Sequence, residues 1–132
     1  MYYLDTNICS YFLKGSSEKV LEKLSKTKSK DIRIPSIVKA ELLYGAYKCD
    51  NKNNIIERIT LFLNRFEIEE FDSDMAVNYA EIRANLEKEG IPIGPNDLLI
   101  ASIVLTKGGI LVTNNEKEFS RIPGLRVENW SK

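Results

Sequence analysis

The sequence contains no histidine in its 132 residues. Histidine is the most frequent general base near neutral pH and the commonest zinc ligand in proteins. Its absence excludes nucleophiles that are activated by histidine and zinc sites that are built on imidazole. Catalysis by this chain would have to use carboxylates, hydroxyls, lysines or a metal ion held by oxygen atoms.

Cysteine and long apolar runs are also scarce. The two cysteines, Cys9 and Cys49, do not form a Cys-x-x-Cys motif, and we expect both to be reduced thiols. The longest uncharged apolar run, Leu98 to Leu105, is far shorter than the ~20 residues that span a bilayer. We therefore expect a soluble, cytoplasmic protein. No repeat or linker divides the chain, which predicts a single domain over residues 1–132.

Net charge is absent as well, because 19 Lys and Arg balance 19 Asp and Glu. The charge is nevertheless uneven: residues 14–58 hold 11 basic and six acidic side chains, a difference of +5. The basic residues concentrate at Lys19, Lys23, Lys26, Lys28, Lys30 and Arg33. Such a segment either contacts nucleic-acid phosphates or forms the solvated face of a helix, and both interpretations stay open.

Short apolar runs alternate with helical patterns along the chain. The predicted strands are Tyr2–Leu4, Ile32–Ile34, Phe66–Phe71 and Ile110–Val112, with an edge strand near Arg126–Glu128. The predicted helices follow Pro35 and cover residues 54–64, Ser73–Lys88 and residues 97–106. This alternation predicts an α/β fold with a central parallel, Rossmann-like sheet of four or five strands, flanked by helices on both faces. Ligand sites in such sheets lie beyond the carboxyl ends of the strands.

Two of the helices have an apolar period close to 3.6 residues. In the helix after Pro35, which Ser36 is expected to cap, the predicted buried stripe consists of Ile37, Ala40, Tyr44 and Tyr47. In the helix Ser73–Lys88 it consists of Met75, Tyr79, Ile82 and Leu86. The segment Lys107-Gly108-Gly109 predicts the end of the helix before it, because glycine favours the left-handed conformation that terminates helices.

Three acidic residues are predicted to face inward. Asp5 directly follows the first strand, where a doubly wound sheet presents side chains to its ligand crevice. Glu41 lies on the predicted buried stripe of its helix, and Asp97 shares a helix face with Ile100 and Ala101. A buried carboxylate without a partner is costly. The three acids therefore need a shared explanation.

A divalent cation would provide that explanation, because mutual repulsion raises carboxyl pKa values and hard cations prefer carboxylate oxygen. We predict that Asp5, Glu41 and Asp97 are ligands of Mg²⁺, or of Mn²⁺. One ion would orient and deprotonate a water for attack on a phosphodiester, and a second would stabilise the leaving oxygen. The alternatives are structural: Asp5 and Asp97 as helix caps, and Glu41 as the partner of a buried Lys or Arg.

A fourth catalytic carboxylate is predicted in the polar segment after the last core strand. Glu118 is the candidate, with Thr113 and Asn115 as supporting hydrogen-bond donors or water ligands. Thr6 and Asn7, directly after Asp5, are expected to support the same site. An ordinary polar turn, to which Asn and Thr are well suited, is the alternative.

At these residues the sequence resembles the PIN-domain family, and within it the VapC toxins of bacterial toxin–antitoxin systems. The matching segments are Leu4-Asp5-Thr6-Asn7, Pro35-Ser36 with Glu41-Leu42-Leu43-Tyr44-Gly45-Ala46, Gly94-Pro95-Asn96-Asp97 with Ile100-Ala101, and Leu111-Val112-Thr113-Asn114-Asn115 with Glu118-Phe119. The ending, from Arg121-Ile122-Pro123-Gly124-Leu125 to Glu128-Asn129-Trp130, looks like the subgroup that is specific for initiator tRNA.

The resemblance implies a toxic Mg²⁺-dependent endoribonuclease that cuts initiator tRNA in the anticodon stem-loop. It also implies a homodimer and a VapB-type antitoxin that inserts a segment across the acidic pocket. Asp5, Glu41 and Asp97 match the family's acidic ligands position by position. Many members have an aspartate two residues after the threonine, where this chain has Asn115, and Glu118 is the candidate replacement.

Three other functions compete with this interpretation. A nucleotide-binding module would need a glycine-rich phosphate loop after a strand, and no G-x-G-x-x-G or G-x-x-x-x-G-K-[ST] motif is present. A phosphoacceptor receiver domain would need paired acids after the first strand, where only Asp5 is found. A catalytically inactive PIN scaffold that binds RNA or protein agrees with the missing aspartate at position 115, and it is the main alternative to an enzyme.

Overall fold

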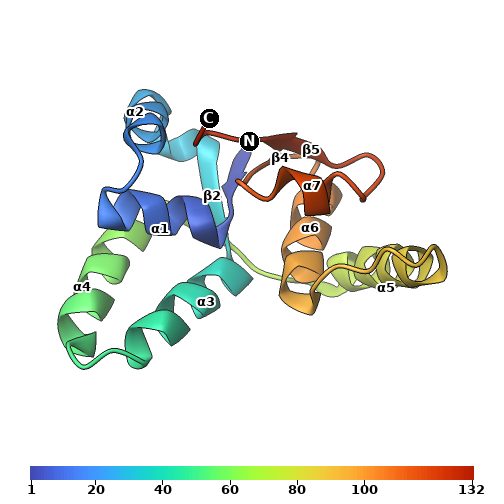
Figure 1. Ribbon diagram of the computed structural model, residues 1–132, viewed down its shortest axis with the longest axis horizontal. Helices are drawn as coiled ribbons and strands as arrows, with labels where there is room; N and C mark the ends of the chain where they lie inside the picture. The colour runs from blue at the N-terminus through green and yellow to red at the C-terminus, as the bar shows by residue number, and fades with distance from the viewer.

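A parallel sheet of five strands in the order β3-β2-β1-β4-β5 forms the centre of the computed structural model, which describes residues 1–132 (Figure 1). The strands are β1 (Tyr2–Leu4), β2 (Ile32–Pro35), β3 (Glu67–Glu69), β4 (Ile110–Val112) and β5 (Arg126–Glu128). The predicted α/β fold and all five predicted strands are confirmed. The third strand is shorter than predicted, because only the middle of the run Phe66–Phe71 pairs with β2.

Seven α-helices and one 3₁₀ turn connect the strands. They are α1 (Thr6–Lys14), α2 (Glu18–Lys26), η1 (Ser29–Asp31), α3 (Ser36–Tyr47), α4 (Lys52–Leu63), α5 (Ser73–Lys88), α6 (Pro95–Lys107) and α7 (Glu116–Phe119). Right-handed crossovers place α1 to α4 on one face of the sheet and α5 and α6 on the other, because the strand order reverses direction after β3. No helix has both the length and the apolar character needed to cross a membrane.

The point where the strand order reverses lies between β1 and β4. Their register pairs Tyr2 with Ile110 and Leu4 with Val112. The ladder continues past the strand, since the backbone N–H of Asp5 donates to the carbonyl of Val112 at 2.9 Å. Asp5 and Thr113 therefore leave the sheet side by side. Doubly wound sheets bind their ligands beyond the carboxyl ends of the strands at this point, which we call the switch point.

Helix α3 buries a different stripe from the predicted one. Val38, Leu42 and Ala46 are buried, whereas Tyr44 and Tyr47 are 65% and 63% exposed. Both stripes are apolar and have helical spacing, so periodicity does not distinguish them. The sheet selects the compact aliphatic stripe, and the tyrosines, which carry a polar hydroxyl, face solvent. Glu41 lies at the border of the buried stripe and is half-buried.

The predicted cap of α3 was also wrong. Ser36 is the first helical residue, and Pro35 occupies the N-cap position without a side-chain hydrogen bond. The prediction for α5 is confirmed, because Met75 and Leu86 are buried and Tyr79 and Ile82 are partly buried against the core. Helix α6 ends as predicted at Gly108, which has a left-handed φ of 67°.

One apolar core of 28 buried residues lies on both faces of the sheet. Cys9 belongs to it and Cys49 is exposed, and both are free thiols, as predicted. Gly109, the residue directly before β4, lies against the ring of Tyr3. An added Cβ at Gly109 would lie 2.4 Å from Cε1 of Tyr3 and 3.0 Å from the carbonyl oxygen of Met1. The close packing of β1 against β4 therefore requires glycine at this position.

Candidate active site

Asp5 is the most deeply buried acid of the chain, at 4% exposure. It is the N-cap of α1, where its Oδ1 accepts a 2.8 Å hydrogen bond from the backbone N–H of Thr6. Its Oδ2 accepts a 2.6 Å hydrogen bond from the hydroxyl of Thr113. Burial raises the pKa of Asp5, while these two hydrogen bonds lower it and the charges of Glu41 and Glu118 raise it further. Asp5 thus has a capping role and also faces other carboxylates.

The loop after β4 connects three parts of the site. The hydroxyl of Thr113 accepts a 3.0 Å hydrogen bond from the backbone N–H of Asn115, in addition to its donation to Asp5. The side chain of Asn115 donates to Oε2 of Glu118 at 2.8 Å. Thr113 and Asn115 therefore support Asp5 and Glu118 respectively. This arrangement is more than a polar turn, because both side chains orient acids.

Asn114, between them, binds the start of α1. Asn7 donates to Oδ1 of Asn114 at 2.9 Å, and Asn114 donates to the hydroxyl of Tyr11 at 2.5 Å. Asn7 therefore acts on the loop and makes no bond to an acid. Neither Asn114 nor Tyr11 was predicted to be a site residue, although Asn114 lies in one of the matching segments. Their hydrogen bond joins residues that are 103 positions apart in the chain, so no local sequence pattern predicts it.

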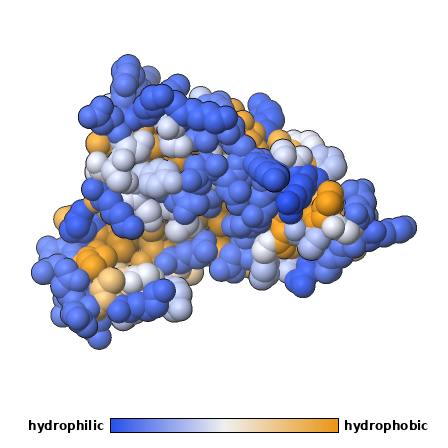
Figure 2. Space-filling view, in the orientation of Figure 1, coloured by the Kyte–Doolittle hydropathy of each residue, from blue (hydrophilic) through white to orange (hydrophobic).

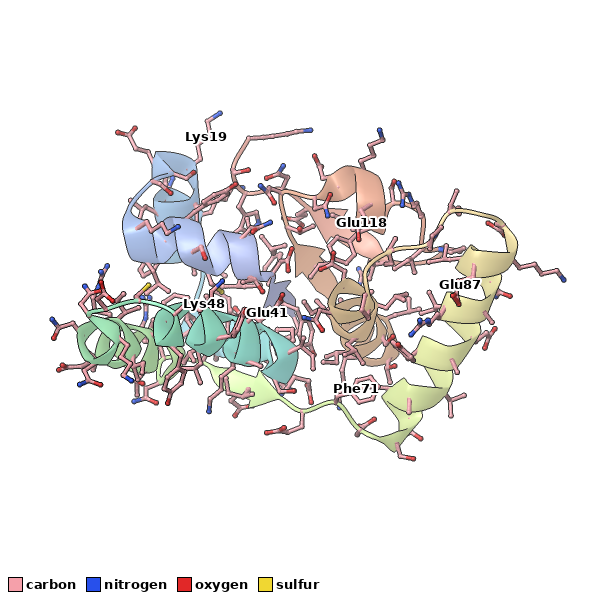
Figure 3. The ribbon with its side chains drawn as sticks, turned by 60° about the horizontal axis from the view of Figure 1, so that its bottom comes forward. Lys19, Glu41, Lys48, Phe71, Glu87 and Glu118 are labelled. Atoms are coloured by element: carbon pink, nitrogen blue, oxygen red, sulfur yellow. The ribbon has the colours of Figure 1, made fainter.

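Glu41 lies on α3, near the same carboxyl ends of the strands. Its Oε1 accepts a 2.7 Å hydrogen bond from the hydroxyl of Thr6. No Lys or Arg forms an ion pair with Glu41, so the alternative of a buried basic partner is wrong. Figure 3 shows Glu41 and Glu118 close to the ends of the central strands, on α3 and α7. Thr6 thereby orients Glu41 as Thr113 orients Asp5.

Glu118 acts on the protonation of Asp97. Asp97 lies in the first turn of α6, whose N-cap is Gly94 and has no side-chain hydrogen bond, so Asp97 does not cap its helix. Burial, a hydrogen bond to Glu118 and the charges of Asp5, Glu118 and Glu41 raise the pKa of Asp97 to about 7. Burial would raise the pKa of Glu118 too, but hydrogen bonds from Asn115, Asp97 and Gly94 and the charge of Arg121 lower it. Asp97 therefore keeps its proton to a higher pH than an ordinary aspartate does.

Four carboxylates lie beyond the carboxyl ends of the strands, those of Asp5, Glu41, Asp97 and Glu118, and we call them the acidic edge. Their chemistry fits a divalent cation. The charges of Glu41 and Glu118 raise the pKa of Asp5 and, together with the charge of Asp5, that of Asp97. None of the four acids belongs to an ion pair. They do not converge into a ready cage of three acidic ligands. Mg²⁺ usually takes only one or two protein carboxylates and keeps several waters, so a loose cluster of acids suits it.

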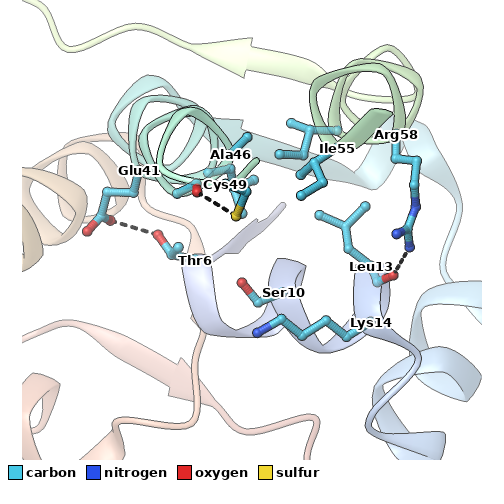
Figure 4. Close-up of a pocket in the computed structure, with 12 residues that line it drawn as sticks. Thr6, Ser10, Leu13, Lys14, Glu41, Ala46, Cys49, Ile55 and Arg58 are labelled. Carbon is cyan, nitrogen blue, oxygen red and sulfur yellow. Dashed lines mark hydrogen bonds between the residues drawn. The ribbon is translucent and has the colours of Figure 1, made fainter. Parts of the chain in front are cut away.

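A cavity of about 310 Å³ opens beside Glu41 between α1, α3 and α4. Figure 4 shows Thr6 and Glu41 at one end of this cavity and Leu13, Ile55 and Arg58 towards the other. In Figure 2 an apolar surface lies in the same region, at the lower left. The acidic edge therefore continues into an apolar hollow.

The basic segment lies elsewhere. Lys28 precedes η1 and Lys30 lies in it, and η1 leads into the start of β2, whereas Glu41 follows the end of β2. The lysines thus lie at the amino-terminal ends of the strands, and the acids lie at the opposite, carboxyl-terminal ends. Figure 3 shows Lys19 on α2 pointing away from Glu41 and Glu118. This position favours the solvated-face interpretation of the segment.

Comparison with known sequences gives matches over nearly the whole chain. A family model described as the PIN domain matches residues 2–125, a range that includes all four carboxylates. Ribonuclease VapC2 of Rickettsia felis is 44% identical over 133 residues, which cover 100% of this chain and 99% of that relative. The tRNA(fMet)-specific endonuclease VapC of Salmonella typhimurium is 37% identical over 129 residues, covering 98% of this chain and 97% of the relative.

Solved structures agree with the sequence matches. A chain in the VapBC2 crystal structure from Rickettsia felis, bound to a DNA fragment from the promoter, superimposes with a TM-score of 0.91 at 44% identity, with 98% of each chain covered. DNA-bound VapBC from Salmonella typhimurium gives a TM-score of 0.92 at 37% identity, covering 98% of this chain and 97% of that one.

Proposed function

The chain belongs to the PIN domain family, and we propose that it is a metal-dependent endoribonuclease toxin of a toxin–antitoxin pair. One observation carries the proposal: Asp5, Glu41, Asp97 and Glu118 lie around the switch point of the sheet, and none of them has a basic partner in an ion pair. Repelling carboxylates at a ligand-binding edge suit a catalytic cation better than a structural role.

Relatives at 37% to 44% identity support the reaction class, because they are named ribonucleases or endonucleases. The proposed substrate is initiator tRNA, cut in the anticodon stem-loop. Its support is the name of the Salmonella typhimurium relative, a tRNA(fMet)-specific endonuclease. The proposed partner is a VapB-type antitoxin, supported by the VapBC complexes among the structural neighbours. We further propose that the toxin is cytoplasmic and homodimeric, with residues 1–132 forming one PIN domain.

Asp5, Glu41 and Asp97 would hold Mg²⁺ or Mn²⁺ in this proposal, and Glu118 would complete the acidic edge. A bound ion of this kind lowers the pKa of a coordinated water and neutralises charge on a phosphodiester. The chain's own residues prepare the site: Thr113 orients Asp5, Thr6 orients Glu41 and Asn115 orients Glu118. These neutral donors satisfy the carboxylate oxygens without offering a competing positive charge.

The test is incubation of the purified protein with total bacterial tRNA and Mg²⁺ or Mn²⁺, followed by mapping of new RNA ends. A discrete cut in the anticodon stem-loop that disappears with EDTA and in Asp5→Asn supports the whole proposal. Cuts at other RNA positions with the same metal and Asp5 dependence retain the nuclease and reject the proposed substrate.

The alternative is a catalytically inactive PIN scaffold that binds RNA or protein. Its one favourable observation is Asn115 in place of the aspartate found in many family members. Asn115 nevertheless donates to Glu118, which brings a carboxylate to the same edge. The absence of any cutting by protein that binds the metal would favour the scaffold.

A further inference from the structure

Arg121 is a basic side chain at the margin of the acidic edge, beside Glu118. It follows Glu118 by three residues, in the turn after α7, and its charge helps to lower the pKa of Glu118. No basic side chain contributes comparably at Asp5 or Asp97. Arg121 does not approach Glu118 closely enough to form an ion pair. Its guanidinium therefore has no carboxylate as a direct contact partner.

The position of Arg121 is set by the loop that leads into α6. Its Nη1 donates a 2.9 Å hydrogen bond to the carbonyl oxygen of Pro92. Two residues further along this loop, the backbone N–H of Gly94 donates to Oε1 of Glu118 at 3.3 Å. Gly94 in turn lies against Asp97, since a Cβ at Gly94 would be 4.0 Å from Oδ2 of Asp97. Arg121, Glu118 and Asp97 thus border the same short loop.

The guanidinium keeps most of its binding capacity. It has five N–H donors in a planar fork, and one of them is used by Pro92. The side chain is only half-buried, so the fork is accessible from solvent. Arginine in this state suits phosphate oxygens, because the fork binds two of them at once.

We propose that Arg121 binds a phosphate of the RNA backbone next to the phosphodiester that is cut. This inference rests on the proposed nuclease function and adds a substrate-binding residue to it. A polyanionic strand is repelled by four carboxylates, and a fixed cation at their margin would hold the strand in register with them. Pro92 limits the movement of the guanidinium, so that little side-chain entropy is lost when the phosphate binds.

Arg126 offers a matched control. It also donates from its guanidinium to a backbone carbonyl, that of Gly108. It lies at the start of β5, paired with Ile110 at the start of β4, and therefore at the amino-terminal ends of the strands. The two arginines make the same kind of contact with the protein and differ in their distance from the acids.

The experiment separates binding from cleavage. In the Asp5→Asn background, binding of total bacterial tRNA is measured by fluorescence anisotropy over a series of KCl concentrations, with Arg121→Gln, Arg121→Lys or Arg126→Gln added. We expect Arg121→Gln to weaken binding about 10- to 100-fold and to reduce the slope of log K against log [KCl] by ~0.7 to 0.9, the contribution of one phosphate contact. Arg126→Gln should change neither quantity.

The outcomes decide the proposal separately from the nuclease function. An unchanged affinity and salt slope in Arg121→Gln overturn it, as does the failure of Asp5→Asn protein to bind tRNA. If Arg121→Gln does not fold, Arg121→Lys decides: weaker binding with the same salt slope supports a bidentate contact, and unchanged binding overturns it. Wild-type protein that binds tRNA through Arg121 without cutting would overturn the nuclease proposal alone.

Discussion

The hydroxyl of Thr113 donates a 2.6 Å hydrogen bond to Oδ2 of Asp5, although the two residues are 108 positions apart in the chain. Both groups are buried, and both follow strands that are neighbours at the switch point of the sheet. The bond fixes the orientation of the Asp5 carboxylate, on which the charges of Glu41 and Glu118 act.

Replacing Thr113 with valine tests this bond. The variant keeps the side-chain shape and leaves Asp5 with one donor fewer, so we expect cleavage and metal affinity to fall by ~10- to 100-fold. The free energy of unfolding should decrease by ~1 to 3 kcal/mol. Thr113→Ser keeps the hydroxyl and should restore most of the activity. Equal cleavage rates for the valine and wild-type proteins would show that the bond is not needed.

Replacing Asp97 with asparagine should separate activity from stability. The change removes a proposed metal ligand. We therefore expect a larger loss of cleavage than the ~10- to 100-fold that is typical when a residue hydrogen-bonded to a metal ligand is replaced. It also removes one charge from the repelling cluster of Asp5, Glu41 and Glu118, so the melting temperature should stay the same or rise. Circular dichroism melts measure this directly. A large drop in melting temperature would assign Asp97 a structural role.

The pH dependence of stability should reflect Asp97. Its pKa is raised to about 7 in the folded protein, whereas an unfolded aspartate titrates near ~3.9. The folded state therefore binds the proton more tightly. The stability that this group contributes is fully present below about pH 4 and is lost as the pH rises through about 7. We expect metal-free protein to melt at a higher temperature near pH ~5 than near pH ~8.

Two controls accompany that measurement. Asp97→Asn should flatten the profile between these pH values, and Mg²⁺ or Mn²⁺ should raise the melting temperature most at the higher pH, where the carboxylates are ionised. The lowered pKa of Glu118 acts in the opposite direction and in a more acidic range, so it does not mask the effect. A melting temperature that rises steadily from pH ~5 to pH ~8 in EDTA would contradict the expectation.

Two glycines provide a matched test of packing. Gly109→Ala places a Cβ against Tyr3 and the carbonyl of Met1 and should destabilise the protein by ~1 to 3 kcal/mol. Gly45→Ala, in α3, meets no atom within 4 Å and should stabilise it by ~0.5 to 1 kcal/mol, because alanine favours the helix. Urea unfolding compares the two. Similar effects of both substitutions would exclude a steric role for the Tyr3 contact.

Much of the fold could be predicted from the sequence because its causes are local. The five strands are short apolar runs, and α6 ends where Gly108 adopts a left-handed conformation. Asp5 and Asp97 were identifiable because an acid follows a strand in one case and shares an apolar helix face in the other. Each of these signals lies within a few residues.

The stripe that α3 buries could not be predicted in this way. The stripe with Tyr44 and the stripe with Leu42 are both apolar, and the choice between them depends on which side of the helix meets the sheet. The place of the basic segment was equally undetermined, because the charge of Lys28 and Lys30 is visible in the sequence but the edge of the sheet they occupy is not.

By itself the sequence determined the parallel α/β architecture, the absence of any histidine chemistry and the candidate acids Asp5 and Asp97, since residue type and spacing are sufficient for these. The tertiary structure alone decided that Glu118 lies where it raises the pKa of Asp97, that Thr6 and Thr113 orient Glu41 and Asp5, and that Arg121 borders the acids. These contacts join different elements of the chain. Their geometry depends on strand order and helix packing, which bring together residues that no local pattern connects.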